Sequence, residues 1–331
     1  MRETLNLLRC MSLDCNDVLI KNAHKRYKIV YKNKLKHAKI ESTSRYIDEA
    51  SNRTRAAWNI INMYRNDERH KQGQMSTLNE LNAFFIDSVE KLVNSIPRSA
   101  ITPCELLPFK AFPGFCFRTV TTNDIRQVIR GMRSSRSRDI YGLTTIPIKS
   151  SAEALLEPLK HVINSSIHTG IFPDALKAAA IIPIPKKGKD ECRPISILPI
   201  ISKIFERVLF LQMLEYFEEN QILSDAQCGF RVGKGTQDAI ALVLKELMNA
   251  IEEGEYAILS AYDLSKAFDC LNRQILLDKL QYYGFDRHSC DLIKSYFRNR
   301  TQVVRVDMEV SDPLPIEYGA AQGAILAPHF L

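Results

Sequence analysis

The chain has 331 residues, of which 45% are hydrophobic, so it can bury a substantial core and form two or three domains. It contains no run of 18 apolar residues, which excludes a typical membrane-spanning helix. The formal net charge of +7 is uneven: residues 1–75 hold 16 Lys and Arg against 8 Asp and Glu, whereas the remaining 256 residues hold 29 against 30.

Eight cysteines are spread through the sequence without a C-x-x-C pair, which argues against a zinc-binding motif. The N-terminal stretch MRETLNLLRCMSLDC mixes charged with apolar residues and lacks the pattern of a secretory signal. We therefore expect an intracellular protein of the cytoplasm or the nucleus, with reduced thiols, no disulfide partner and no membrane association.

The basic excess predicts a charged helix over residues 21–40. This stretch lacks Pro and Gly, and lysines recur on one face at steps of three and four: Lys21, Lys25, Lys28, Lys32, Lys36 and Lys39. A basic arm on a near-neutral body is typical of polyanion binding, so we expect this face to bind RNA or DNA phosphates. The alternative is an ordinary solvent-exposed helix face.

Further elements are expected before residue 119. They are a helix containing Trp58, a loop at 70–75, an amphipathic helix at 77–93 and a connector rich in proline and aromatic residues at 96–118. We assign residues 1–75 to a basic helical linker and residues 76–118 to a helix with its connector.

Beyond residue 119 the pattern predicts strands that alternate with helices. The expected elements are a capped helix at 121–132, a strand running into a basic loop at 178–189, a helix at 202–220, a buried strand at 256–263, a helix at 272–284 and a strand with a hairpin at 301–307. This alternation indicates the α+β or α/β class for residues 119–331.

The stretch AYDLSKAFD carries two aspartates, Asp263 and Asp269, and the first of them ends the apolar run YAILSAYD. A carboxylate at the end of a buried strand is unfavourable without a partner, which a metal ion or a lysine supplies. Lys266 lies between the two aspartates and is one candidate to neutralise a carboxylate.

Four motifs in fixed order resemble the reverse transcriptases of non-LTR retrotransposons, most of all the jockey-type mobile elements. They are IIPIPKKGKDECRPISILPIISKIFERVL, ILSDAQCGFRVGKGTQDAI, AYDLSKAFDCLNRQILLDKL and GAAQGAILAP. The resemblance covers roughly residues 119–331. More weakly, YIDEASNRTRAAWNII and LNAFF resemble the helical linker that precedes the polymerase region in this family.

The resemblance implies an α+β fold in which a helical N-terminal linker precedes the fingers and part of the palm of a right-hand polymerase. It implies RNA-directed DNA polymerase activity, a nucleotidyl transfer that uses two Mg²⁺ ions. The implied partners are an RNA template, a DNA primer and deoxynucleoside triphosphates.

The resemblance also implies roles for residues of the AYDLSKAFD stretch. Asp263 matches the first catalytic, metal-binding carboxylate, and the backbone carbonyl of Leu264 is a further candidate ligand. Phe268 matches the aromatic residue that lies under the incoming sugar, although ordinary core packing is an alternative. Asp269 is expected to be structural and to cap the helix that begins near residue 272.

Other family positions map onto nucleotide and template contacts. Lys187 and Arg193, expected in a basic loop, match residues that approach the triphosphate, with a solvent-exposed turn as the alternative. Gln322 and Gly323 match the loop that contacts the nucleotide and the template base. Arg231 either contacts the template or fixes the fingers by an internal salt bridge, and the sequence leaves both interpretations open.

The sequence also departs from the family pattern. The family places a hairpin [FY]-x-D-D downstream of the Gln322 motif, whereas this sequence stops at Leu331 and contains no Asp-Asp dipeptide. Ala321, Ala324 and Ala327 stand where the family usually has Pro, Ser and Gly. We therefore expect a truncated polymerase that does not extend a primer. The alternatives are a non-catalytic remnant that binds RNA or DNA, and an unstable fragment without function.

Overall fold

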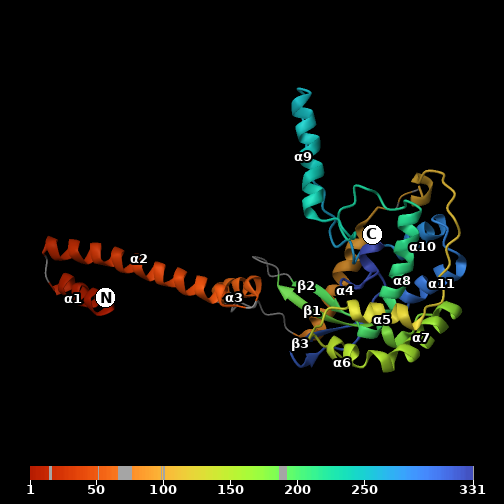
Figure 1. The fold of residues 1–331 in the computed structure, drawn as a ribbon, viewed down its shortest axis with the longest axis horizontal. Coiled ribbons are helices and arrows are strands. Elements are labelled where there is room, and N and C mark those ends of the chain that lie inside the picture. The colour runs from red at the N-terminus through yellow and green to blue at the C-terminus, as the bar shows by residue number, and fades with distance from the viewer. Residues whose placement is uncertain are drawn as a thin grey trace. The chain divides into compact units, whose positions relative to one another are not determined.

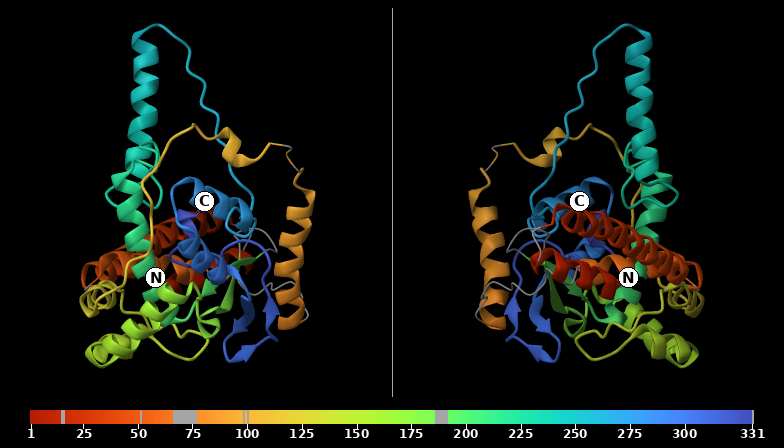
Figure 2. Two further views of the ribbon diagram at one scale, coloured as in Figure 1. Left: turned by 90° about the vertical axis from the view of Figure 1, so that its right-hand side faces the viewer. Right: turned by 90° about the vertical axis from the view of Figure 1, so that its left-hand side faces the viewer.

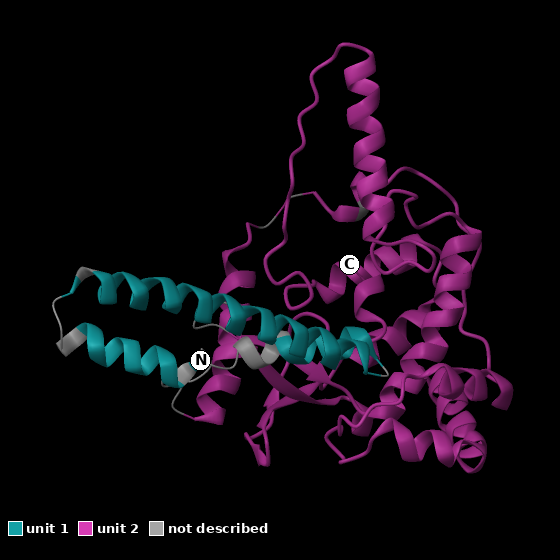
Figure 3. Cartoon of the chain, turned by 60° about the vertical axis from the view of Figure 1, so that its left-hand side comes forward, with its two compact units in different colours: residues 1–73 teal, residues 74–331 magenta. Residues whose placement is uncertain are grey.

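The computed structural model describes residues 1–14, 17–50, 52–65, 77–97, 99, 101–185 and 192–330. The chain divides into two compact units, Met1–Gly73 and Gln74–Leu331 (Figure 3). The predicted loop at 70–75 and Lys187 lie outside the described residues.

The first unit is helical. It consists of α1 (Arg2–Asp14), α2 (Val18–Asp48) and α3 (Arg53–Arg65), and α2 contacts both of the others. Asp17 caps α2 by accepting a hydrogen bond from the amide of Leu19 at 2.8 Å. The predicted basic helix at 21–40 is therefore confirmed as the central part of α2, and the helix with Trp58 is confirmed as α3.

The second unit contains a five-stranded mixed sheet. Strand β1 (Ala178–Pro185) pairs with β2 (Cys192–Ile197) in antiparallel fashion and with β3 (Thr301–Val306) in parallel. Strand β3 also pairs with the short strands β4 (Glu309–Val310) and β5 (Leu314–Pro315), both antiparallel. The strands predicted near residues 178 and 301 are confirmed, and so is the hairpin that follows the second.

The helices that build the core either precede β1 or lie between β2 and β3 in sequence (Figure 1). They are α5 (Thr122–Gly131), α6 (Thr145–Ser150), α7 (Ala152–Thr169), α8 (Ile200–Glu219), α10 (Arg273–Tyr282) and α11 (Arg287–Phe297), with single 3₁₀ turns at Pro103–Leu106, Asp174–Leu176 and Ala327–His329. A mixed α+β class is therefore confirmed. The predicted capped helix is α5, in which Thr121 and Asp124 form a reciprocal capping box.

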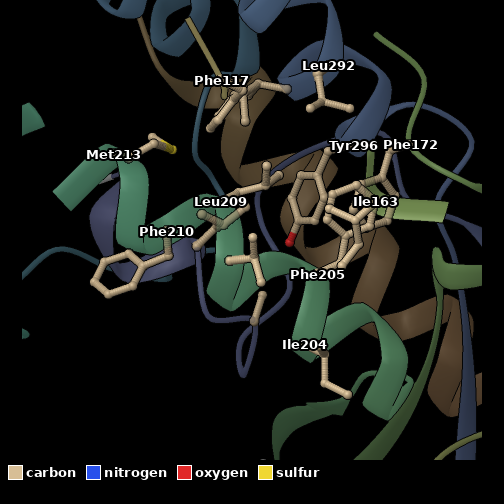
Figure 4. Packing of buried hydrophobic residues seen from close by; sticks show 14 of the residues in the cluster. Phe117, Ile163, Phe172, Ile204, Phe205, Leu209, Phe210, Met213, Leu292 and Tyr296 are labelled. Atoms are coloured by element: carbon tan, nitrogen blue, oxygen red, sulfur yellow. The ribbon is translucent and has the colours of Figure 1, made fainter. Parts of the chain in front are cut away.

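Aromatic packing fixes the centre of this core. The ring of Phe172 stacks on Phe205 at 4.7 Å between centroids and meets Tyr296 edge-on at 5.1 Å (Figure 4). All three side chains are almost fully buried. They join the segment before β1 to α8 and α11, so the strand that begins the sheet is fixed to two helices that follow it in sequence, α11 by about a hundred residues.

Helix α4 (Leu78–Ser95) attaches to the sheet through a buried amide. The side chain of Asn82 donates to the carbonyl of Gln302 at 3.3 Å and to Ser311 at 3.1 Å, and it accepts from the side chain of Gln302 at 2.9 Å. Since a buried amide costs free energy unless its hydrogen bonds are made, this network specifies where α4 lies on β3.

The prediction of a buried strand at 256–263 is wrong. These residues have no regular secondary structure, and Tyr256, Ile258 and Tyr262 are more than 90% exposed. They follow α9 (Thr236–Glu252), which stands away from the rest of its unit (Figure 2). The apolar pattern indicated burial, but a strand also requires a hydrogen-bonding neighbour, and no described strand pairs with this segment.

We expect Phe205→Ala to lower the free energy of unfolding by about 3–5 kcal/mol, because it removes the buried ring that stacks on Phe172 and leaves a cavity in the core. Phe109→Ala is the matched control, since this ring is fully exposed, and it should change stability by less than about 0.5 kcal/mol. Urea denaturation of both variants measures the difference. Equal losses would contradict the position of Phe205 in the core.

Candidate functional site

A pocket of about 180 Å³ lies where six segments of the second unit meet. Its walls come from α4, from the strands β1, β2 and β3, from the turn with Lys266 and Asp269, and from residues 316–322. Most of the pocket surface is apolar. The few polar residues that line it include Asp269, Gln322 and Ser196. Such a mixture is typical of small-molecule sites, in which few polar groups orient the ligand.

The turn of the AYDLSKAFD stretch brings Lys266 and Asp269 together. The carbonyl oxygen of Lys266 accepts hydrogen bonds from the amides of Asp269 and Cys270, each at 2.9 Å. Burial raises the pKa of the Asp269 carboxyl, and the positive charge of Lys266 partly opposes that effect. Asp269 is therefore a half-buried pocket residue beside a lysine.

The expectation that Asp269 caps the next helix is wrong. The N-cap of α10 is Asn272, whose side chain accepts from the amides of Gln274 at 3.0 Å and Ile275 at 3.1 Å. Asn is among the residues most favoured at this position, so the cap needs no second acceptor.

The segment GAAQG fits tightly between this turn and β2. Gly319 has φ +69° and Gly323 has φ +131°, and a Cβ at either residue would collide with a carbonyl oxygen, that of Asp269 or that of Ser196 respectively. The amide of Ser196 donates to the carbonyl of Gln322 at 2.9 Å. Gln322 is thereby positioned on the pocket wall by backbone contacts on both sides.

Arg273 of α10 holds the chain that enters this segment. Its guanidinium donates to four carbonyl oxygens, those of Phe297, Ile316, Tyr318 and Gly319, at 3.0–3.2 Å. Burial lowers the pKa of Arg273 to about 10, so the side chain stays charged at neutral pH. The role of Arg273 could not be predicted from the sequence. Its partners are backbone carbonyls distant along the chain, and such contacts produce no sequence motif.

Two further buried carboxylates bind backbone amides in this unit, and no sequence motif indicated either of them. Asp139 accepts from the amides of Tyr141, Leu143 and Ile200, each at 2.9 Å, and so caps α8, whose own N-cap residue is a proline. Glu206 of α8 accepts from the amide of Ile325 at 2.8 Å, two residues after the GAAQG segment. Burial raises the pKa of the Glu206 carboxyl.

The predicted site residues divide into groups. Gln322 lines the pocket, and Gly323 supports it from the next position. Phe268 is half-buried, packs against the core and meets Phe230 edge-on at 6.2 Å, as the core-packing alternative requires. Asp263 and Leu264 are exposed and do not line the pocket.

The prediction that Arg193 lies in a basic loop is wrong, because this residue lies within β2. Its neighbours Cys192 and Pro194 line the pocket, and successive side chains of a strand point to opposite faces. Arg193 therefore points away from the pocket and is exposed.

The side chain of Arg231 is bound to α8 and to the turn that follows it. It donates to Glu218 at 2.6 Å and to the carbonyl of Ser224 at 2.8 Å, and only 10% of its side chain is exposed. These contacts favour the internal salt bridge over a template contact. The six lysines of α2 are all exposed: Lys21, Lys25, Lys28, Lys32, Lys36 and Lys39.

The described residues do not fit a two-metal site. They include no group of three or more His, Cys, Asp or Glu side chains able to hold a metal ion, and Asp263 stands in the exposed segment. None of the helices described combines the length and apolar character that crossing a bilayer requires.

We expect Arg273→Lys to accelerate hydrogen exchange at the amides of Gly319 and Ala320, which donate to Leu271 and Phe268. Lysine keeps the charge but cannot reach four carbonyl oxygens, so the segment loses its anchor. Mass spectrometry of exchanged peptides measures the change.

Arg305→Lys is the matched control, because Arg305 also binds two backbone carbonyls, those of Arg138 and Asp139. Each variant should lose about 1–3 kcal/mol of stability. Only Arg273→Lys should affect residues 319–320, and the same exchange pattern in both variants would contradict a local role.

Comparison with known proteins bears on this site. Residues 184–331 match the family model of reverse transcriptase (RNA-dependent DNA polymerase). This range includes β2, the Lys266 turn and the GAAQG segment, whereas α4 precedes it.

Three relatives come from Drosophila melanogaster. The probable RNA-directed DNA polymerase from transposon BS is 29% identical over 222 residues, which are 64% of this chain and 24% of that protein. The RNA-directed DNA polymerase from mobile element jockey is 31% identical over 214 residues, 63% of this chain and 23% of that protein. The probable RNA-directed DNA polymerase from transposon X-element is 32% identical over 178 residues, 50% of this chain and 19% of that protein.

The chain thus spans about a quarter or less of the length of the relatives it matches. The matches confirm the resemblance drawn from the four motifs. The chain contains a reverse transcriptase domain, homologous to those of the RNA-directed DNA polymerases of jockey and other non-LTR transposons.

Proposed function

We propose that this chain forms the nucleotide-binding part of an RNA-directed DNA polymerase that acts on an RNA template, a DNA primer and deoxynucleoside triphosphates. The observation that carries the proposal is the pocket in which Lys266 and Asp269 meet Gln322 beside β2. Three segments distant in sequence, each within the reverse transcriptase match, thus contribute to one small-molecule site.

Within this proposal, the sheet with its covering helices corresponds to the fingers and part of the palm. Residues 1–75 act as a basic linker and residues 76–118 as a helix with its connector. Transposon polymerases work on nucleic acids inside the cell, so we propose the cytoplasm or the nucleus as the compartment.

Individual roles follow from the family positions. We propose that Gln322, Gly323 and Phe268 contact or support the nucleotide, and that Lys187 and Arg193 meet the triphosphate. For Arg193 this requires a rearrangement of β2, since its side chain points away from the pocket. Lys187 lies outside the described residues.

Asp263, with the carbonyl of Leu264, stays our candidate Mg²⁺ ligand. The 331 residues contain no Asp-Asp pair, and the described residues form no metal cluster. We therefore propose that the 331-residue chain binds nucleotide without extending a primer. Metal-dependent extension of a primer on an RNA template by this chain would overturn that part of the proposal.

We expect Gln322→Ala to weaken binding of deoxynucleoside triphosphates about fivefold or more, because Gln322 lines the pocket and its amide offers both donors and an acceptor. Gln281→Ala removes an exposed amide from α10 and is the matched control. Isothermal titration calorimetry measures both affinities. Undiminished binding by the Gln322 variant would refute the assignment of the pocket.

A second function, nucleic-acid binding by α2, is favoured by its charge. Residues 18–40 contain eight Lys and Arg and no acidic residue, and the lysine face is exposed along the helix. At 1.5 Å per residue, the stripe from Lys21 to Lys39 is about 27 Å long, enough to span several phosphates.

We expect the double variant Lys28→Gln and Lys32→Gln to reduce the slope of log affinity against log salt concentration by about 1.5, because two phosphate contacts are lost. The matched control replaces Arg26 and Lys34, which are exposed on the opposite side of the same helix. Fluorescence anisotropy with labelled RNA at several salt concentrations measures the slopes. The same slope in both variants would show that net charge acts without a specific face.

A further inference from the structure

The charges around the pocket are unequal. Among the described residues that line it, Lys266 is the only cation, whereas Asp269 and Glu317 are acidic. A nucleotide brings several negative charges, and these require a positive partner inside or at the rim of the site. Since the Arg193 side chain points to the other face of β2, Lys266 is the candidate cation among the described residues that line the pocket.

The backbone of Lys266 is strained. Its φ is +51°, in the left-handed region that disfavours a residue with a Cβ. The conformation persists because the Lys266 carbonyl accepts two amides, those of Asp269 and Cys270. Strain retained at a pocket residue is typical of sites in which the side-chain direction matters for binding.

The ammonium group of Lys266 is also held in place. It donates to the hydroxyl of Ser88 at 2.6 Å, and that hydroxyl donates in turn to the carbonyl of Phe85 at 3.0 Å. Ser88 is thereby oriented by the backbone of α4, and Phe85 itself lines the pocket. The ammonium group of Lys266, although it ends a long flexible side chain, is therefore held at a defined position on the pocket wall.

We propose that Lys266 is the group that binds a phosphate of the nucleotide, and that Ser88 of α4 is its positioning residue. This inference rests on the proposed function, since it names the phosphate contact of the same pocket. It assigns a role to α4, which precedes the residues that match the reverse transcriptase family. The apolar wall with Phe85, Ile181 and Tyr318 is left for the sugar or the base.

The test compares dTTP with thymidine, which lacks phosphates. In the unaltered chain dTTP should bind more tightly, by calorimetry for dTTP and by saturation-transfer NMR for thymidine. Lys266→Ala should reduce dTTP affinity about tenfold or more and leave thymidine affinity unchanged, because only the charge-assisted contact is lost. Lys245→Ala, which removes an exposed cation of α9, is the matched control and should change neither.

Two further variants separate binding from folding. Lys266→Gly removes the cation and relieves the left-handed strain, so it should melt no lower than the unaltered chain and still lose dTTP affinity. Ser88→Ala should weaken dTTP binding about two- to fivefold, and Ser88→Thr, which keeps the hydroxyl, should restore it.

The outcomes are distinguishable. If the unaltered chain binds neither ligand, the proposed function falls and this inference falls with it. If dTTP binds and Lys266→Ala keeps the preference of dTTP over thymidine, the inference alone is overturned. An equal loss in Lys245→Ala would also overturn it, because the effect would then come from overall charge.

Discussion

The guanidinium of Arg273 joins α10 to three carbonyl oxygens of a segment more than forty residues away and to a fourth, that of Phe297, at the end of α11. No other side chain carries enough donors in a rigid plane to bind so many acceptors at once. The chain so held leads directly into Gln322, and the turn before α10 supplies Lys266 and Asp269. This one side chain therefore helps to place the two sides of the pocket, which the backbone hydrogen bonds of Gly319 and Ala320 to Leu271 and Phe268 also join.

Buried polar side chains act in a similar way at other junctions. Asn82 joins α4 to β3, Asp139 caps α8 from a distant loop, and Glu206 binds the backbone that follows the GAAQG segment. A buried polar group that loses its partner costs about 1–3 kcal/mol, so each of these contacts disfavours alternative arrangements more than it adds stability. The apolar core supplies the driving force, and the polar junctions determine which arrangement of the elements is reached.

Local signals explain which elements were predictable. The helices α5 and α10 could be predicted from the capping residues Thr121 and Asn272 at their N-termini. Helix α8 could be predicted from the recurrence of its apolar residues. The prediction of a buried strand at 256–263 was wrong, because an apolar pattern indicates a tendency to be buried but does not identify a strand that pairs with the segment. For the site, the motif of Gln322 was visible in the sequence. The contacts of Lys266 with Ser88 and of Arg273 with carbonyls depend on tertiary structure and were not.

The two glycines of the GAAQG segment show where this sequence can change. At Gly319 and Gly323 a methyl group would strike backbone oxygens, which cannot move aside without shifting the Lys266 turn or β2. The departures from the family pattern lie elsewhere, at Ala321, Ala324 and Ala327, where the structure accommodates a methyl group. The substitutions that this segment tolerates are therefore limited by the space between its backbone and neighbouring carbonyl oxygens. A change at Gly323 would be tolerated only together with a displacement of β2, the strand that carries Ser196. Substitutions in the GAAQG segment and in β2, which are far apart in sequence, are therefore expected to be coupled.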